Sequence, residues 1–393
     1  YLNEKEILNL FSIKNNTPID VTTLNNDIKK AYKTDRFEYI NYDIVNIDDT
    51  TTKLILNVKE SENKKLKLGA VWDNHYKLIG KIKIDIFNKP FRNFRLQDEL
   101  LFSGIKKNKL TLYYLLTHNN KTNLIPFIEF INQIKDIGWY CYDDELPECA
   151  SNNIHYWNHD FKEISYGLIY PISKFGSISF SYNKFDSKYK KALDPTISIE
   201  NNNIYYTKIK LDIDQIDNLL HPRNGYQINL SYQKSNDTFS DGYGDEYNGY
   251  NYLSLNWNYY KTFNYNHTMR FFNQYRKSND IIPLYLKVNY GGSDWAIGYN
   301  EFTLSSSNLH LMGIEYQYHF KSSITYRLIL NKVIKIHTDE RSYTEAPINY
   351  GIGIKIRSLL GPIDFTWGRG HIDYLDKNSK ENNIFYFNFG VEI

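Results

Sequence analysis

Serine and histidine side chains are the first candidates for chemistry in this chain, because a hydroxyl beside an imidazole can act as an activated nucleophile. Ser231, Ser254 and His319 all fall in segments with a strand-like pattern. The chain contains no Gly-x-Ser-x-Gly segment, which would predict a nucleophile elbow. Polar residues on the wall of a sheet explain these three better than a hydrolase site, so we predict no catalytic residue.

Metal ligands and disulfides are the next candidates. The 10 histidines are scattered and show no His-Glu-x-x-His or other paired spacing. Segment 241–245, Asp-Gly-Tyr-Gly-Asp, resembles a calcium loop, but it lacks the EF-hand spacing and is more typical of a turn. Cys141 and Cys149 could close a small loop or stay free thiols, and both alternatives remain open. We therefore predict no metal and no cofactor.

The composition is unusual for a soluble protein. The 393 residues include 36 Tyr, 22 Phe and 6 Trp, yet the mean hydropathy is −0.56. Membrane-spanning strands are apolar only at alternate residues, so a barrel can cross a bilayer with such an average. A large soluble all-β protein is the alternative that composition alone allows.

Hydropathy, net charge and the start of the chain bear on membrane helices, partners and targeting. No stretch approaches ~18 consecutive apolar residues, so no transmembrane helix is predicted. The net charge of +2 gives no reason to expect a nucleic-acid partner. Because the chain starts at Tyr1 with no signal peptide, we expect that a targeting segment has been removed.

The elements that would position any site are strands, because apolar and polar residues alternate from residue 62 onward. In segment 80–87 the Gly and Ile residues face one way, and Lys81, Lys83 and Asp85 face the other. Segments 205–213, 226–232 and 385–393 show the same period of two. Sixteen such segments start near residues 65, 77, 94, 109, 124, 161, 176, 204, 225, 251, 267, 308, 322, 349, 361 and 383.

The links between these segments distinguish a barrel from a sandwich. Links after even-numbered segments are short, around 88–93, 118–123, 171–175, 214–224, 261–266, 321 and 359–360. Most links after odd-numbered segments are long: 133–160, 185–203, 235–250, 277–307, 337–348 and 369–382. Outer-membrane barrels have short periplasmic turns and long outer loops. The sequence therefore predicts a mainly β fold, a 16-stranded antiparallel transmembrane barrel over residues 62–393.

Residues 1–61 have a different pattern. Apolar residues at helical spacing predict a short helix from Glu4 to Phe11 and a second helix that Thr22 or Thr23 would cap. Two strand-like runs follow, at 37–45 and 53–58. We predict a small α+β domain.

This small domain resembles a POTRA domain. The segment from Tyr32 to Phe37 is similar to the Tyr-x-Thr-x-x-Phe pattern that ends a POTRA helix. Val58-Lys59-Glu60 is similar to the Val-x-Glu pattern that ends the last POTRA strand. The usual first strand is missing. The resemblance implies a periplasmic module that binds extended chains by adding them to its sheet edge. A generic α+β linker domain is the alternative.

Three barrel segments resemble the Omp85 superfamily. Segment 220–226 carries Pro222 and Gly225 where members have a Pro-x-x-Gly turn. The long link 277–307 carries Gly291 and Gly292, then Ile297, Gly298 and Tyr299, where members fold an Arg-Gly-Tyr or Arg-Gly-Phe tip into the lumen. Ile297 replaces that Arg, so the usual ion pair to the wall cannot form. We expect Tyr299 to stack on the wall instead.

The third segment resembles the penultimate strand of the superfamily, and it carries Gly361, Pro362, Asp364 and Gly368. Asp364 would point into the lumen. The last strand must meet the first strand to close the barrel, and Gly69 and Gly390 would weaken the packing at this seam. A seam that opens could accept a strand from a substrate.

The resemblance implies a secretion barrel in the outer membrane, with its POTRA-like domain in the periplasm. One small domain and the altered tip favour the translocator of a patatin-like autotransporter over a barrel-assembly insertase or a two-partner secretion pore. Implied partners are outer-membrane lipid, an unfolded passenger, the barrel assembly machinery and periplasmic chaperones. A homodimer stays open. A passive porin and a barrel-embedded hydrolase are the alternatives from other classes.

Overall fold

The structure is a computed structural model. It describes residues 4–13, 17–33, 37–48, 51–60, 64–73, 76–87, 93–114, 124–140, 154–173, 176–191, 198–218, 221–240, 246–278, 282, 288–293, 295–299, 304–306, 308–321, 323–337, 342–343, 348–358, 361–371 and 381–390.

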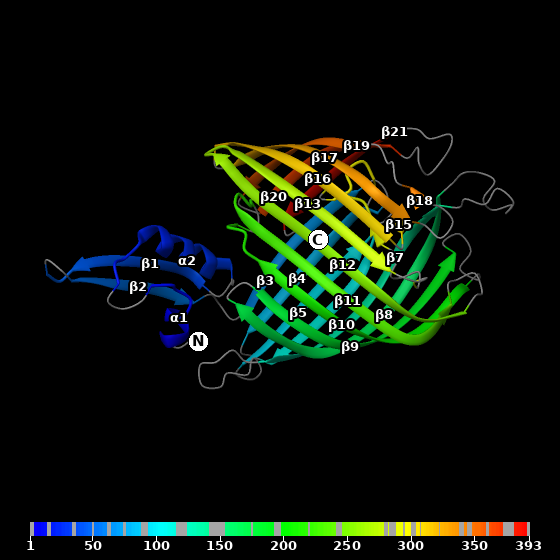
Figure 1. Ribbon diagram of the computed structural model, residues 1–393, viewed down its shortest axis with the longest axis horizontal. Coiled ribbons are helices and arrows are strands. Elements are labelled where there is room, and N and C mark those ends of the chain that lie inside the picture. The colour runs from blue at the N-terminus through cyan, green and yellow to red at the C-terminus, as the bar shows by residue number, and fades with distance from the viewer. Residues whose placement is uncertain are drawn as a thin grey trace.

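A small α/β unit comes first along the chain (Figure 1). It consists of helices α1 (Glu4–Leu8) and α2 (Val21–Lys33) and the antiparallel strands β1 (Phe37–Asn46) and β2 (Thr52–Glu60). Its core is formed by Phe11, Leu24, Ala31, Phe37 and Ile40. Among the helices that the structure describes, none has the length and apolar character needed to cross a membrane.

The start of α2 corrects one prediction. Neither Thr22 nor Thr23 is the cap, because both use Asp20 as their acceptor. The Asp20 carboxylate accepts from the Thr22 amide at 2.9 Å and from the Thr23 hydroxyl at 2.5 Å. These hydrogen bonds hold the pKa of Asp20 below its usual value. An aspartate carboxylate is therefore the group that satisfies the free amides of the first turn.

Sixteen long antiparallel strands form a closed barrel, as the alternation predicted. They are β3 (Lys64–Asp73), β4 (Lys77–Phe87), β5 (Phe94–Ser103), β6 (Lys106–Tyr114), β7 (Ile125–Tyr140), β8 (Ile154–Ser173), β9 (Gly176–Lys191), β10 (Ser198–Asp214), β11 (Gly225–Ser240), β12 (Glu246–Asn264), β13 (His267–Ser278), β16 (Asn308–Phe320), β17 (Ile324–His337), β19 (Ile348–Ser358), β20 (Gly361–His371) and β21 (Glu381–Gly390). The two-residue β18 (Ser342–Tyr343) extends the edge of β17.

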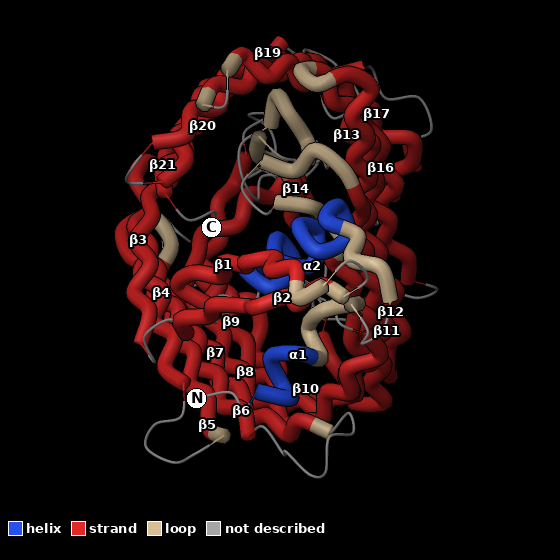
Figure 2. The backbone as a smooth tube through the Cα atoms, turned by 90° about the vertical axis from the view of Figure 1, so that its left-hand side faces the viewer, coloured by secondary structure: helices blue, strands red, loops and turns tan. Residues whose placement is uncertain are grey.

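The two ends of the barrel differ in their longest links, as predicted, but the links 192–197 and 241–245 are shorter than predicted. We call the end with links such as 265–266 and 359–360 the turn end, and the opposite end, with links 141–153 and 279–307, the loop end. The α/β unit lies beyond the turn end, in front of the barrel opening (Figures 1 and 2).

Several strands extend further toward the loop end than predicted. Residues 133–140, 154–160, 185–191, 198–203, 235–240 and 246–250 were expected in loops but belong to β7–β12. The alternation fades there because the outward positions change from apolar to charged. On β8 the outward residues from Ile164 to Ile172 are apolar and exposed, whereas Lys162 and Asp160 continue the same face. The alternation of apolar and polar residues therefore predicted only the apolar part of each of these strands, not its full length.

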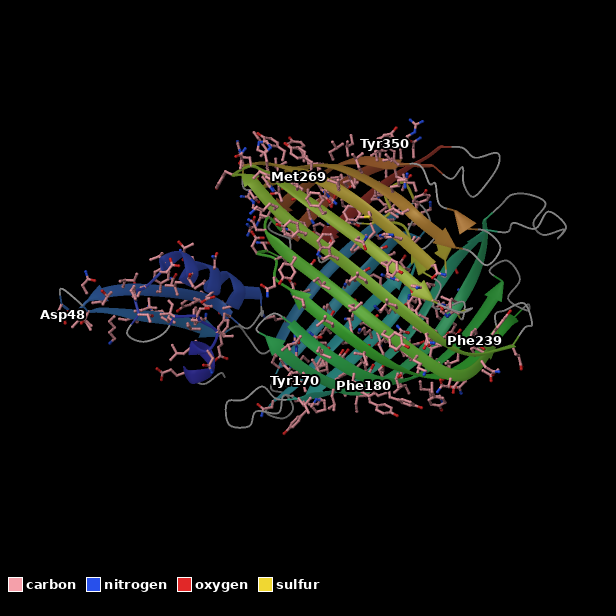
Figure 3. The ribbon with its side chains drawn as sticks, in the orientation of Figure 1. Asp48, Tyr170, Phe180, Phe239, Met269 and Tyr350 are labelled. Atoms are coloured by element: carbon pink, nitrogen blue, oxygen red, sulfur yellow. The ribbon has the colours of Figure 1, made fainter. Side chains whose placement is uncertain are left out.

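The two faces of the barrel wall carry different side chains. Tyr170, Phe180 and Tyr350 point outward, and each is more than a third exposed (Figure 3). The inward residues are mostly polar and buried, among them Ser181, Asn183, Ser231, Gln274 and Gln317. The wall is thus apolar on the outside and polar on the inside.

Candidate functional site

The long link between β13 and β16 folds into the barrel, where its tip is buried. Figure 2 shows part of this link, including β14 (Val288–Tyr290), inside the ring of strands. The tip, residues 291–299, is tied to itself by a hydrogen bond from the Gly292 amide to the Tyr299 carbonyl of 2.9 Å. Gly291, Gly292 and Gly298 have φ angles of 152°, 91° and 87°, so this turn needs residues that tolerate positive φ. The lumen-loop residues that the sequence predicted therefore form one compact turn.

Ile297 fits against glycines of the barrel wall. A Cβ atom placed on Gly351 of β19 would lie 2.4 Å from Cδ1 of Ile297, and one on Gly368 of β20 would lie 2.3 Å from Cγ1. One on Gly370 would lie 2.6 Å from the Gly298 carbonyl oxygen. Only glycine leaves this space free. The tip residue that replaces the expected Arg thus packs as an apolar side chain into a groove of backbone.

Tyr299, which we expected to stack on the wall, is buried against it. Its side chain is buried in an apolar cluster with wall residues, but its carbonyl oxygen makes the specific contact by accepting from the Tyr386 hydroxyl at 2.6 Å. The Tyr386 hydroxyl also accepts from the Gly298 amide at 3.0 Å. Asn388 donates to Ser293 Oγ at 3.2 Å. Strand β21 therefore holds the tip through side-chain hydrogen bonds.

A buried charge network lies on the wall beside the tip. Glu315 of β16 accepts from Arg270 of β13 at 3.0 Å and from Arg327 of β17 at 2.7 Å. Arg327 also pairs with Asp364 of β20 at 2.5 Å. Two arginines and two carboxylates balance, which is what burial of these charges requires. Asp364 was predicted to face the lumen and it does, whereas the sequence analysis missed the other three.

Arg270 connects this network to the link. Its guanidinium lies 5.5 Å from the ring of Trp295 and 4.6 Å from that of Phe272, both within cation–π range. Asn331 of β17 donates to the Trp295 carbonyl at 2.9 Å. The arginine that contacts the tip thus belongs to the wall. In the motif described above, by contrast, the Arg belongs to the tip and its partner to the wall. Charged residues at inward positions of three neighbouring strands were the sequence signal for this network.

The predicted turn motif forms the link from β10 to β11. Asp217 Oδ1 accepts from the Arg223 amide at 2.8 Å and from the Asn224 amide at 3.2 Å. Gly225 has a φ of 108°, and a Cβ there would lie 2.1 Å from the Gln215 carbonyl oxygen. Pro222 sits inside this turn. The turn residues therefore have a structural role, as their types predicted.

His221 in the same turn is half-buried. Its amide donates to Asn218 Oδ1 at 3.0 Å, and its Nε2 has no hydrogen-bond partner among the described residues. Burial, together with the nearby positive charges of Lys355 and Arg357, lowers the pKa of His221 to about 4. The imidazole is therefore neutral at neutral pH.

The last strand, β21, closes the barrel by pairing with the first strand, β3. β21 pairs with β3 through four residue pairs among the described residues, from Phe387–Trp72 to Gly390–Gly69. Every other pair of neighbouring long strands has eight or more. Gly69 and Gly390 are directly opposed, and Gly390 has a φ of 78°. Gly361 approaches the same point, since its Cβ would lie 2.9 Å from the Gly390 Cα.

Among the described residues, the Ser candidates of the sequence analysis do not pair with the His candidate. Ser231 and Ser254 are neighbours across β11 and β12, but His319 bonds to Thr268 and Thr325 at 2.9 and 3.0 Å. Cys141, Cys149 and segment 241–245 lie outside the described residues. Within the described part of the chain, no group of three His, Cys, Asp or Glu residues could hold a metal ion.

The geometry defines a class of protein: a closed sixteen-stranded barrel with a buried internal link and an α/β unit at its turn end. No protein-family model matches the chain, and no curated protein matches it in sequence.

Solved structures share the fold. BamA of Haemophilus ducreyi, in a crystal structure lacking POTRA domains 1–3, has a TM-score of 0.60 at 11% identity, covering 99% of this chain and 81% of that chain. CdiB of Acinetobacter baumannii has a TM-score of 0.59 at 10% identity, covering 97% and 70%. CdiB of Escherichia coli has 0.59 at 10%, covering 99% and 74%. The chain thus shares the barrel fold of BamA and CdiB.

Proposed function

We propose that this protein is an outer-membrane barrel that moves polypeptide into or across the membrane. The outward face supports a membrane location, because contiguous apolar surface of this extent is not stable in water. On β8 the apolar outward residues span 164–172. A tilted strand needs about 9–11 residues to cross the hydrocarbon.

The seam between β21 and β3 is the observation that carries the transport proposal. Among the described residues it has four residue pairs, whereas every other junction between long strands has at least eight. The opposed glycines Gly69 and Gly390 add no side-chain packing. We propose that the barrel opens at this junction, where the freed edges would accept a strand from a substrate.

The α/β unit fits a role in delivering substrate. Strand β1 pairs only with β2 among the described residues, so the small sheet offers edges to which an extended chain can add. Its place beyond the turn end fits a POTRA-like domain in the periplasm. We propose outer-membrane lipid, unfolded polypeptide and periplasmic chaperones as partners.

The fold supports two branches of this function. BamA and CdiB have the same fold, which supports an insertase or a secretion pore. The patatin-like autotransporter is a narrower proposal, and Ile297 at the tip is the feature of this chain that supports it. A patatin domain with Gly-x-Ser-x-Gly encoded directly before Tyr1 would support it, and a continuous coding sequence without one would contradict it.

Locking the seam tests the proposed function. Val71 and Asn388 are opposed across β3 and β21, so V71C with N388C should form a disulfide. Cys141 and Cys149 are first replaced by Ser. The assays are surface exposure of a reporter fused before Tyr1, and folding of a test barrel in proteoliposomes.

We expect the oxidised seam pair to abolish one of these activities and a reductant to restore it. The matched control is S165C with N183C, which are opposed across β8 and β9 away from the seam. Oxidation of this pair should leave the activity intact. If the oxidised seam variant works as well as the reduced one in both assays, opening of the seam is not part of the function.

A further inference from the structure

An aromatic socket interrupts the polar lumen near the loop end of β8–β12. Its main wall residues are Phe185, Ile204, Phe239, Tyr250 and Tyr252, each no more than 5% exposed. Neighbouring inward positions of the same strands carry polar residues such as Asn183, Ser231 and Ser254. The apolar patch is therefore local.

The rings of the socket pack on one another. Phe185 lies 5.3 Å from Phe161 in a stacked arrangement, and Phe239 lies 6.1 Å from Tyr250, edge to face. Both geometries are favourable for aromatic pairs and restrict ring motion. The socket is thus a preformed apolar surface, which lowers the cost of binding an apolar group.

One side chain from outside the wall already occupies the socket. Ile282 belongs to the long link between β13 and β16, and it is completely buried in the cluster. The same link is anchored at its tip by β13, β17 and β21. It therefore contacts the wall in two places, and at the second place the Ile282 side chain is buried in the cluster.

We propose that the socket is a binding site for one bulky apolar side chain of a polypeptide in the lumen, and that Ile282 is its resident competitor. This rests on the proposed transport function, since that function brings polypeptide into the lumen. The socket accepts a branched aliphatic side chain now, so side chains of the Ile, Leu or Phe type fit its chemistry. The polar wall around it would leave the backbone of such a polypeptide hydrated.

Binding to the purified protein in detergent tests this inference without any transport assay. The probe is a fluorescein-labelled Gly-Ser peptide with one central Phe, compared with the same peptide carrying Ser. In I282S the socket is empty, and we expect the Phe peptide to bind roughly tenfold more tightly than the Ser peptide, the gain from burying one apolar side chain. Fluorescence anisotropy gives both affinities.

Three comparisons make the test specific. I282L keeps the socket filled and should show little preference for Phe, like the unsubstituted protein. Adding Y252S or F239A to I282S should abolish the preference for the Phe peptide. Two wall variants are used so that the test still holds if one of them fails to fold. S231D combined with I282S alters the lumen outside the socket, so this variant should keep the preference for the Phe peptide.

Equal binding of the two peptides to I282S would overturn the inference, and so would a preference that survives Y252S and F239A. Failure of the seam experiment would leave this result unaffected, because detergent binding requires no opening between β3 and β21. The two proposals therefore fail separately.

Discussion

At the scale of single residues, the tip of the link shows how one substitution changes its surroundings. With Ile297 in place of an Arg, the tip brings no positive charge to neutralise the buried carboxylates of the wall. Here Glu315 and Asp364 are neutralised by Arg270 and Arg327 of the wall. Ile297 needs only an apolar cavity, which the wall glycines provide. Charge balance and packing are therefore consistent with each other.

We predict that G368A destabilises the barrel by about 1–3 kcal/mol, because the new methyl group would overlap Ile297. I297A should relieve the overlap, so the double variant should lose less than the sum of the single changes. Urea unfolding in lipid vesicles measures this. G353A is the matched control, since its methyl would meet Thr366 Oγ1 at 2.7 Å rather than Ile297, so its cost should add to that of I297A. An additive double variant would contradict the packing argument.

A second residue-scale prediction concerns pH. The folded pKa of His221 is about 4, below the usual value of 6.5. The unfolded chain therefore takes up this proton first as the pH falls, and folding stability should decrease from pH 6.5 to pH 4. Above pH 6.5 both states are neutral and the contribution is constant. H221Q should flatten this part of the pH profile, and an unchanged profile would contradict the assignment.

At the scale of elements, the sequence predicted strand number, order and starts well because lipid and water would impose a strict period of two. The starts of β4, β5, β9, β11, β13, β16 and β20 were predicted to the residue. The predicted starts of β8, β10 and β12 were too late by several residues. Those strands continue where the outward face turns charged, so the alternation ends before the hydrogen-bond ladder does.

The candidate site was predicted less completely than the fold. The tip glycines, Asp364 and the seam glycines were found because special backbone positions and family motifs mark them. Arg270, Glu315, Trp295 and Tyr386 were missed because their meeting depends on strand register and on the path of the link. Local pattern carries no information about either.

The α/β unit leads to an element-scale prediction. Its core, including Phe11 and Leu24, is self-contained, and the barrel closes through strands that follow residue 60. Deleting residues 1–60 should therefore leave a barrel that folds, seen as a heat-modifiable band in gel electrophoresis, but abolish reporter export or test-barrel folding. A deletion variant with full activity in both assays would contradict a delivery role.

At the scale of the whole molecule, the two ends of the barrel carry different elements. The turn end faces the α/β unit, and the loop end carries the long links, the aromatic socket and the extended strands β7–β12. The internal link joins these regions through Ile282 and the tip. A polypeptide entering at the turn end would meet the tip and then the socket, which gives the transport proposal a direction.

The central claim is that hydrocarbon surrounds this barrel and water fills its lumen. Spin labels placed singly at residues 178, 179, 180 and 181 of β9 test it most directly, with the protein in lipid bilayers. Labels at the outward positions Ile178 and Phe180 should be accessible to oxygen and protected from a polar nickel complex. Labels at Ser179 and Ser181 should show the reverse. Equal access of the nickel complex to all four positions would contradict the claim.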